Sequence, residues 1–180
     1  MISKSKAFMA VVTVLASTST MAANHGHHHG AGHTAMPQGQ SDTSGMALAK
    51  SVSVSGCWIR LLPAPAPSAG YFALKNDTDH EISLVAAAAP EDFAMLMVHQ
   101  TRHENGMSRM SMVNEIPVPS RSQLDFQPGG YHIMLEQPKR DVKVGETVKL
   151  ELLLKSGEKV QTSCEVKPAG NVPMKGHMQH

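Results

Sequence analysis

The feature that most limits the fold is a series of turn signals spaced along the central part of the chain. Asn-Gly at 105–106 separates two runs of alternating residues, a strong sign of a β-hairpin. Pro-Gly-Gly at 128–130 and Ser-Gly at 156–157 divide other short apolar runs. Only residues 81–89 are ambiguous, since their alanines also permit a helix, which Pro90 would stop. No segment has helical periodicity over the length of a helix, so we predict an all-β sandwich or barrel of seven to nine short strands.

The first residues have the pattern of a secretory signal. Lys4 and Lys6 precede a short apolar run, and small residues surround Ala22 and Ala23. The run is too short to span a membrane comfortably. We therefore interpret residues 1–23 as a cleaved signal peptide of a periplasmic protein with no stable membrane insertion after cleavage. The alternative is an uncleaved anchor.

Three further parts follow the signal. Residues 24–49 are rich in Gly, His, Ser and Gln and are predicted to form a disordered leader. Residues 50–168 form the predicted folded domain, and residues 169–180 form a flexible tail. Candidate metal ligands in the leader are His25, His27, His28, His29 and His33, and those in the tail are His177, Met178 and His180.

The composition bounds the function. Sixteen basic residues against 15 acidic ones argue against a nucleic-acid partner, which would require a basic surface. The 13 methionines and 11 histidines are soft or borderline metal ligands, although both residue types also have structural uses. The composition raises a metal-binding hypothesis without deciding it.

The two cysteines are informative in an exported protein. An even number of cysteines in an oxidising compartment favours a disulfide between Cys57 and Cys164, which would join the first and last strands of the domain. Closing a loop of about 100 residues is worth about 4–5 kcal/mol in the chain-entropy model. The alternative is a pair of free, buried thiols.

The Asn-Gly hairpin fixes a register. With 105–106 as the turn, Thr101 faces Met110 and His99 faces Met112. Because strand residues alternate between faces, all four side chains lie on one side of the hairpin. They could meet a second same-face pair, His132 and Met134, which lie about 7 Å apart on another strand.

Two histidines and two methionines would suit Cu(I), because thioether sulfur is soft and imidazole is borderline. Zinc sites rarely use methionine, and a blue-copper site needs a cysteine thiolate beside two histidines. Each residue also has an ordinary interpretation. Met95, Met97 and Met112 could fill the core, His103 could be an exposed residue beside the turn, and His132 with Met134 could be ordinary strand residues.

The spacing H-x10-M-x21-H-x-M resembles that of the periplasmic copper(I) chaperones of the PCu(A)C type. The resemblance covers about residues 51–166. It includes SGCWIRLLPAPAPSAGYFALKN, the block MSRMSMVNEIPVPSRSQLDFQPGGYHIML and the closing hairpin GETVKLELLLKSGEKV. It implies a cupredoxin-like β-sandwich that binds Cu(I) through His99, Met110, His132 and Met134. We expect a carrier and not an enzyme, because the sequence has no nucleophile with a base at recognisable spacing and no phosphate loop. The resemblance also implies delivery of copper to cytochrome c oxidase subunit 2, another exported copper enzyme or another copper chaperone.

The chain departs from this pattern at three features. His103 stands where many relatives carry methionine, the paired cysteines are not a general family feature, and the His-rich leader is an addition. Whether the protein binds a second copper ion therefore stays open. Its possible ligands are His103, Met112, the leader and the tail. The leader imidazoles suit Cu(II), whereas the folded site suits Cu(I).

Two other functions compete with delivery. A periplasmic copper sequestration or tolerance protein would use the His-rich ends as its main sink. A thiol-disulfide oxidoreductase would use Cys57 and Cys164, but the two are not in a C-x-x-C arrangement, which would signal a reactive thiol.

Overall fold

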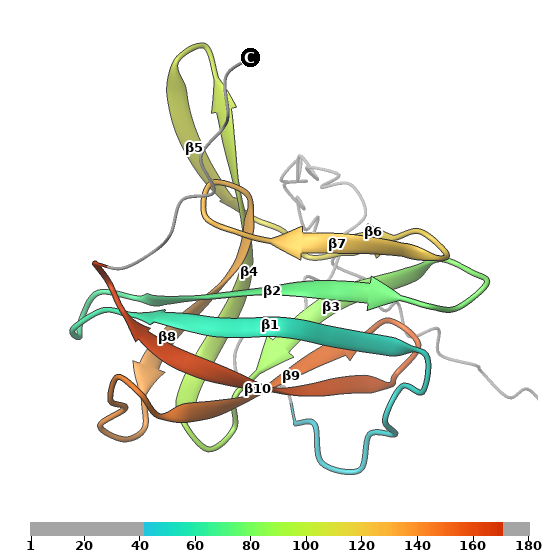
Figure 1. Ribbon diagram of the computed structural model, residues 1–180, viewed down its shortest axis with the longest axis horizontal. Coiled ribbons are helices and arrows are strands. Elements are labelled where there is room, and N and C mark those ends of the chain that lie inside the picture. The colour runs from blue at the N-terminus through green and yellow to red at the C-terminus, as the bar shows by residue number, and fades with distance from the viewer. Residues whose placement is uncertain (1–41, 171–180) are drawn as a thin grey trace, which may run out of the picture. The chain divides into compact units, whose positions relative to one another are not determined.

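The structure is a computed structural model that describes residues 42–170 (Figure 1). These residues contain no helix, and hence none that could cross a membrane. Ten strands form the domain: β1 (Val52–Leu61), β2 (Ser68–Asn76), β3 (Ile82–Ala88), β4 (Phe93–Glu104), β5 (Met107–Met112), β6 (Ile116–Val118), β7 (Ser122–Phe126), β8 (Tyr131–Pro138), β9 (Thr147–Leu154) and β10 (Lys159–Pro168). The all-β prediction is confirmed. The strand count exceeds the predicted seven to nine because strands as short as the three-residue β6 leave no alternation pattern to recognise.

The strands hydrogen-bond in the order β5-β4-β8-β7-β2-β1-β10-β9-β3-β6, and β8 pairs with β2 as well. The neighbours β1 and β10 are parallel, as are β7 and β8, and the other pairs are antiparallel. Residues 82–88 of the ambiguous segment form β3, because Ile82, Leu84 and Ala87 pack into the core and the strand pairs with β9. The arrangement places β8 between β4 and β2, two strands that are not adjacent to it in sequence.

The core is built from alternate residues of nearly every strand. Leu74 of β2, Val98 of β4, Ile133 of β8 and Leu150 of β9 are all at most 2% exposed and belong to one apolar cluster. Since β8 directs Ile133 inward, its neighbour His132 points to the other face of the sheet. The candidate ligands of β8 therefore lie opposite the core rather than in it.

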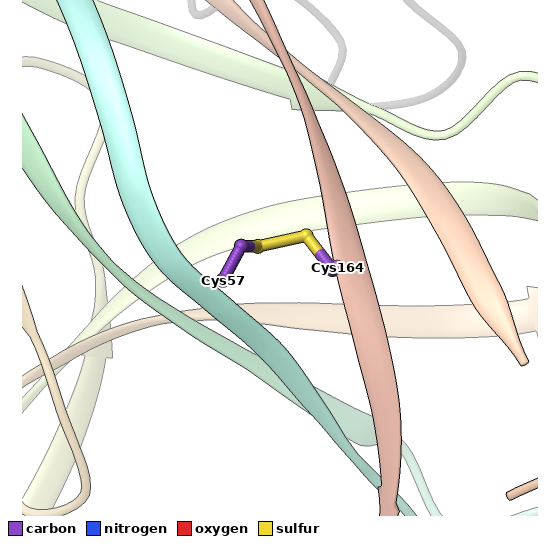
Figure 2. The surroundings of a disulfide bond; sticks show 2 residues. All are labelled: Cys57 and Cys164. Atoms are coloured by element: carbon purple, nitrogen blue, oxygen red, sulfur yellow. A yellow bond between two sulfur atoms is a disulfide. The ribbon is translucent and has the colours of Figure 1, made fainter. Parts of the chain in front are cut away.

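A disulfide between Cys57 and Cys164 joins β1 to β10 (Figure 2), as predicted. The pairing of β1 with β2 shifts register between Ser55 and Trp58, and Gly56 within this bulge has a φ of 62°. Glycine adopts that conformation without steric cost, whereas other residues rarely do. The Cα atoms of the two cysteines are 4.5 Å apart, within the usual range for a disulfide.

The packed part of the chain begins before residue 50. Thr43 is 4% exposed and its carbonyl accepts a hydrogen bond of 2.9 Å from Nζ of Lys159, while Leu48 bridges to the same residue. Residues 42–49, assigned above to the leader, thus contact the first residue of β10. The signal peptide, the rest of the leader and residues 171–180 of the tail lie outside the described residues.

Candidate metal site

The hairpin of β4 and β5 has the register predicted from its turn. Asn105 and Gly106 have φ values of 53° and 76°, as a two-residue hairpin turn requires. Thr101 pairs with Met110, and the His99–Met112 pairing follows two residues further along. The hairpin projects beyond the neighbouring strands (Figure 1).

The second pair of candidate ligands reaches the hairpin because β8 lies beside β4. In this pairing His132 is directly opposite His99, and Met134 is directly opposite Met97. The Pro-Gly-Gly turn that precedes β8 closes with a hydrogen bond from Gly130 N to Gln127 O and brings His132 to the start of the strand. The two sequence-predicted pairs therefore lie on one face of three adjacent strands, β5, β4 and β8.

One contact joins the two pairs directly. Nε2 of His132 lies 3.1 Å from Sδ of Met110, and Nδ1 of His132 lies 3.0 Å from the carbonyl oxygen of Gly130. A carbonyl oxygen only accepts hydrogen bonds, so Nδ1 carries the proton and a neutral ring presents the lone pair of Nε2 to the sulfur. Two lone-pair donors do not hydrogen-bond each other at this distance, but both can bind one soft cation.

His99 is the nearest ring neighbour of His132, with centroids 5.9 Å apart and planes inclined by 81°. Its Nδ1 is buried and has no hydrogen-bond partner within residues 42–170. A buried ring nitrogen without a partner is costly unless a ligand satisfies it. A metal ion is one ligand that would satisfy this nitrogen, although His99 is not among the residues that line the cavity of Met110, His132 and Met134.

The surroundings of both imidazoles lower their pKa values and so favour the neutral form. Burial is the main cause that lowers the pKa of His132, and the charge of Arg60 lowers it further, against the hydrogen bond to Gly130, which raises it. Burial is also the main cause that lowers the pKa of His99. The electrostatic interaction with His132 lowers it further, whereas the charge of Glu136 raises it. Because a protonated imidazole cannot ligate, lowered pKa values favour metal binding near neutral pH.

The four candidate side chains differ in exposure, and His99 is half-buried. His132 and Met134 are 6% and 9% exposed, whereas Met110 is 55% exposed. Met110, His132 and Met134 line a cavity of about 290 Å³ beside the sheet. Met110 is thus the candidate ligand on the solvent side, and an ion held by these side chains would enter or leave past its thioether.

Sequence reasoning missed residues of β1 and β2 that complete this cavity, Arg60 and Tyr71. Tyr71 is 3% exposed, and its ring centroid is 6.4 Å from that of His132. The side chain of Trp58 packs on Tyr71 with centroids 4.5 Å apart. No local signal could have found these residues, because their approach depends on the pairing of β2 with β8.

The remaining candidates have mixed outcomes. Met112 is 52% exposed, so the alternative that it fills the core is wrong, and it stays beside His99 as a possible additional ligand. His103 is exposed, as its place beside the turn suggested, and its Nδ1 lies 2.8 Å from Oγ of Ser108. The candidates in the leader and tail lie outside the described residues, and their binding of Cu(II) stays a prediction.

Within residues 42–170, no three His, Cys, Asp or Glu side chains gather where they could share a metal ion. Two imidazoles alone make an incomplete site, so any ion held here needs the thioethers of the hairpin and β8. This donor chemistry differs from that of zinc sites and from that of hard, oxygen-liganded cations.

The fold defines the class: it is a cupredoxin-like β-sandwich of the PCuAC type, as its match to a solved structure at 37% identity shows. The chain is similar to the copper-bound PCuAC domain from PmoF2, with 18% identity, a TM-score of 0.54 and coverage of 66% of this chain and 94% of that one, a likeness of fold. It is also similar to DR1885 from Deinococcus radiodurans. The Cu(I) form is 37% identical, with a TM-score of 0.54 over 66% of this chain and 80% of that one. The apo form is 31% identical, with a TM-score of 0.51 and coverage of 92% of this chain and 99% of that one.

The chain belongs to the LpqE-like family of lipoproteins, whose model matches residues 52–166. A curated relative is the uncharacterized protein RP573 of Rickettsia prowazekii (strain Madrid E), which is 29% identical over 107 residues. That match covers 59% of this chain and 58% of the relative, so the chain spans less than two thirds of that protein.

Proposed function

We propose that the protein is a periplasmic copper chaperone that carries one Cu(I) ion as cargo, held by His99, Met110, His132 and Met134. It delivers the ion to cytochrome c oxidase subunit 2, to another exported copper enzyme or to another copper chaperone. The observation that carries the proposal is the 3.1 Å approach of His132 Nε2 to Met110 Sδ, two lone-pair donors turned toward each other.

The ligand chemistry supports Cu(I) in particular. Thioether and imidazole are neutral and soft or borderline, and such ligands select Cu(I) over harder cations. The 37% identity to DR1885, whose Cu(I) form has been solved, supports the same metal. Membership of a lipoprotein family and the signal-like pattern at residues 1–23 support export.

A carrier fits the site better than an enzyme does. Neutral ligands bind an ion without a strong charge interaction, and the exposed Met110 leaves one side of the site open to an acceptor. The thiol-disulfide alternative is disfavoured because Cys164 is 0% exposed and its disulfide connects two core strands. Redox-active cysteines are usually partly exposed and lie in electropositive surroundings.

The test replaces one sulfur at a time. In Met110→Leu and in Met134→Leu the side-chain volume is nearly kept, so stability should change by less than about 1.5 kcal/mol. Loss of an outer-shell partner alone costs about 10–100-fold in metal affinity, so loss of a ligand should cost more than about a hundredfold. The measurement is a Cu(I) titration against a competing chelator.

Met107→Leu is the matched control. Met107 lies on the same strand and is 55% exposed like Met110, but it points to the opposite face of the hairpin. Wild-type affinity in the control with weak binding in both ligand variants is the expected result. Equal affinity in all four proteins would refute the site. Incubation of the loaded protein with an apo-acceptor then separates a carrier, which passes its ion on, from a storage protein, which keeps it.

A further inference from the structure

The cavity beside the candidate ligands is lined, within the described residues, by one charged side chain, that of Arg60. Arg60 of β1 pairs with Ala69 of β2, and Ala69 pairs with Met134 of β8, so the three side chains form one row on the outer face of the sheet. The guanidinium of Arg60 lies over the ring of Tyr71, with Cζ 5.8 Å from the ring centroid. The same cavity is lined by Thr101, Met110 and His132.

Arg60 has no anionic partner in the described part of the chain. Its Nε is buried and makes no hydrogen bond there, and no carboxylate forms an ion pair with it. Arg140 shows the usual arrangement, with ion pairs to Asp92 and Glu146. A buried Nε–H without an acceptor is unfavourable, and an anion that the half-buried guanidinium bound in the cavity would offset that penalty.

Copper transfer supplies a reason for such an anion. An acceptor must offer a ligand that binds Cu(I) more strongly than a thioether does, and a thiolate is both soft and negatively charged. Neutral donors would gain nothing from a nearby cation. Arg60 is placed to act on such an anionic ligand, because it lines the same cavity as Met110 and His132.

We propose that Arg60 makes the site selective for a thiolate as the incoming ligand, by donating an N–H to its sulfur inside the cavity. The inference rests on the proposed Cu(I) site. The thiol first loses its proton to solvent. A lone pair of the thiolate sulfur then forms a bond to Cu(I), the bond to Met110 Sδ breaks, and the copper remains Cu(I). Arg60 is thus a specificity-determining residue for transfer, and the partner chemistry is a thiol borne by an acceptor protein or by a small molecule.

The experiment compares two ways of removing copper from the loaded, full-length protein. Wild type, Arg60→Gln and Arg60→Lys each receive one equivalent of Cu(I). Removal rates are measured at pH 8 with dithiothreitol, whose thiolate is anionic, and with neocuproine, a neutral nitrogen chelator. Because dithiothreitol also reduces disulfides, the mass of alkylated protein is measured at each time point, and only rates recorded while the Cys57–Cys164 bridge is intact are compared. Arg109→Gln is the matched control, since it changes the net charge equally. Arg109 precedes Met110 on β5, so its side chain points to the opposite face.

In Arg60→Gln we expect removal by dithiothreitol to slow by about ten- to a hundredfold, the range for loss of a hydrogen bond to a charged group. Removal by neocuproine should be unchanged, and Arg60→Lys should recover much of the lost rate. A Cys-x-x-Cys peptide used in place of dithiothreitol separates the two sources of thiolate. Slowing with both the peptide and dithiothreitol indicates a protein acceptor. Slowing with dithiothreitol but not with the peptide indicates a small thiol.

Four results would overturn the inference: an unchanged rate with dithiothreitol in Arg60→Gln, equal slowing with neocuproine, equal slowing in Arg109→Gln, or no recovery in Arg60→Lys. Cu(I) affinity and thermal unfolding of each variant are recorded beside the rates, so a folding defect is recognised independently. If wild type does not retain Cu(I) at all, the proposed function fails. If it retains Cu(I) but the rates do not depend on Arg60, only this inference fails.

Discussion

Removal of the disulfide should cost this domain much of its stability. The bridge joins residues 107 apart in sequence. The chain-entropy relation gives about 5 kcal/mol at 25 °C for a loop of that length, through its effect on the unfolded state. In Cys57→Ala/Cys164→Ala the loss of the buried Cys164 sulfur adds about 1 kcal/mol for the small cavity. The total is about 6 kcal/mol.

Native domains have free energies of unfolding of about 5–15 kcal/mol, so the double variant should be folded only marginally. The assay is urea unfolding followed by far-UV circular dichroism, with linear extrapolation to water. Since the cross-link keeps the unfolded chain compact, its removal should also increase the m-value. A fully reduced wild type should behave in the same way.

Val148→Ala is the control for the cavity contribution. Val148 is 0% exposed and pairs directly with Cys164 across β9 and β10. This variant should lower the unfolding midpoint without a change in m. If the free energy of unfolding of the cysteine variant falls by less than about 2 kcal/mol and its m-value is unchanged, the loop-entropy argument is refuted. Where the variant is folded it should still bind Cu(I), because the proposed ligands lie on β4, β5 and β8.

The remaining predictions concern the candidate site. The pKa values of His99 and His132 are lowered from 6.5, so Cu(I) binding should persist below pH 6.5 and fade only as the pH drops through the lowered values. By the same linkage the apoprotein loses stability as the pH falls below 6.5, where the unfolded chain takes up protons first. Titrations and urea unfolding from pH 8 to 5 check both, and half-loss of binding at pH 6.5 would contradict the first. Trp58, the single tryptophan, packs on Tyr71 beside His132, so its fluorescence should change on Cu(I) binding in wild type but at much higher copper in Met110→Leu.

The sequence alone determined the local geometry of the candidate site. The Asn-Gly turn requires positive φ at both residues, and that requirement fixes the register of the hairpin and the pairing of His99 with Met112. Alternation along a strand places His132 and Met134 on one face. Both are short-range consequences of backbone stereochemistry, which a few residues encode completely.

Only the tertiary structure decided which strands are neighbours. Nothing in the alternation of β8 says that it lies between β4 and β2, yet that pairing brings His132 to 3.1 Å from Met110 and places Arg60 over the same cavity. Likewise, nothing in residues 42–49 indicated that Thr43 would be buried against Lys159. Strand order depends on the burial of apolar side chains from every strand in one core, a sum over the whole domain that no short stretch of sequence contains.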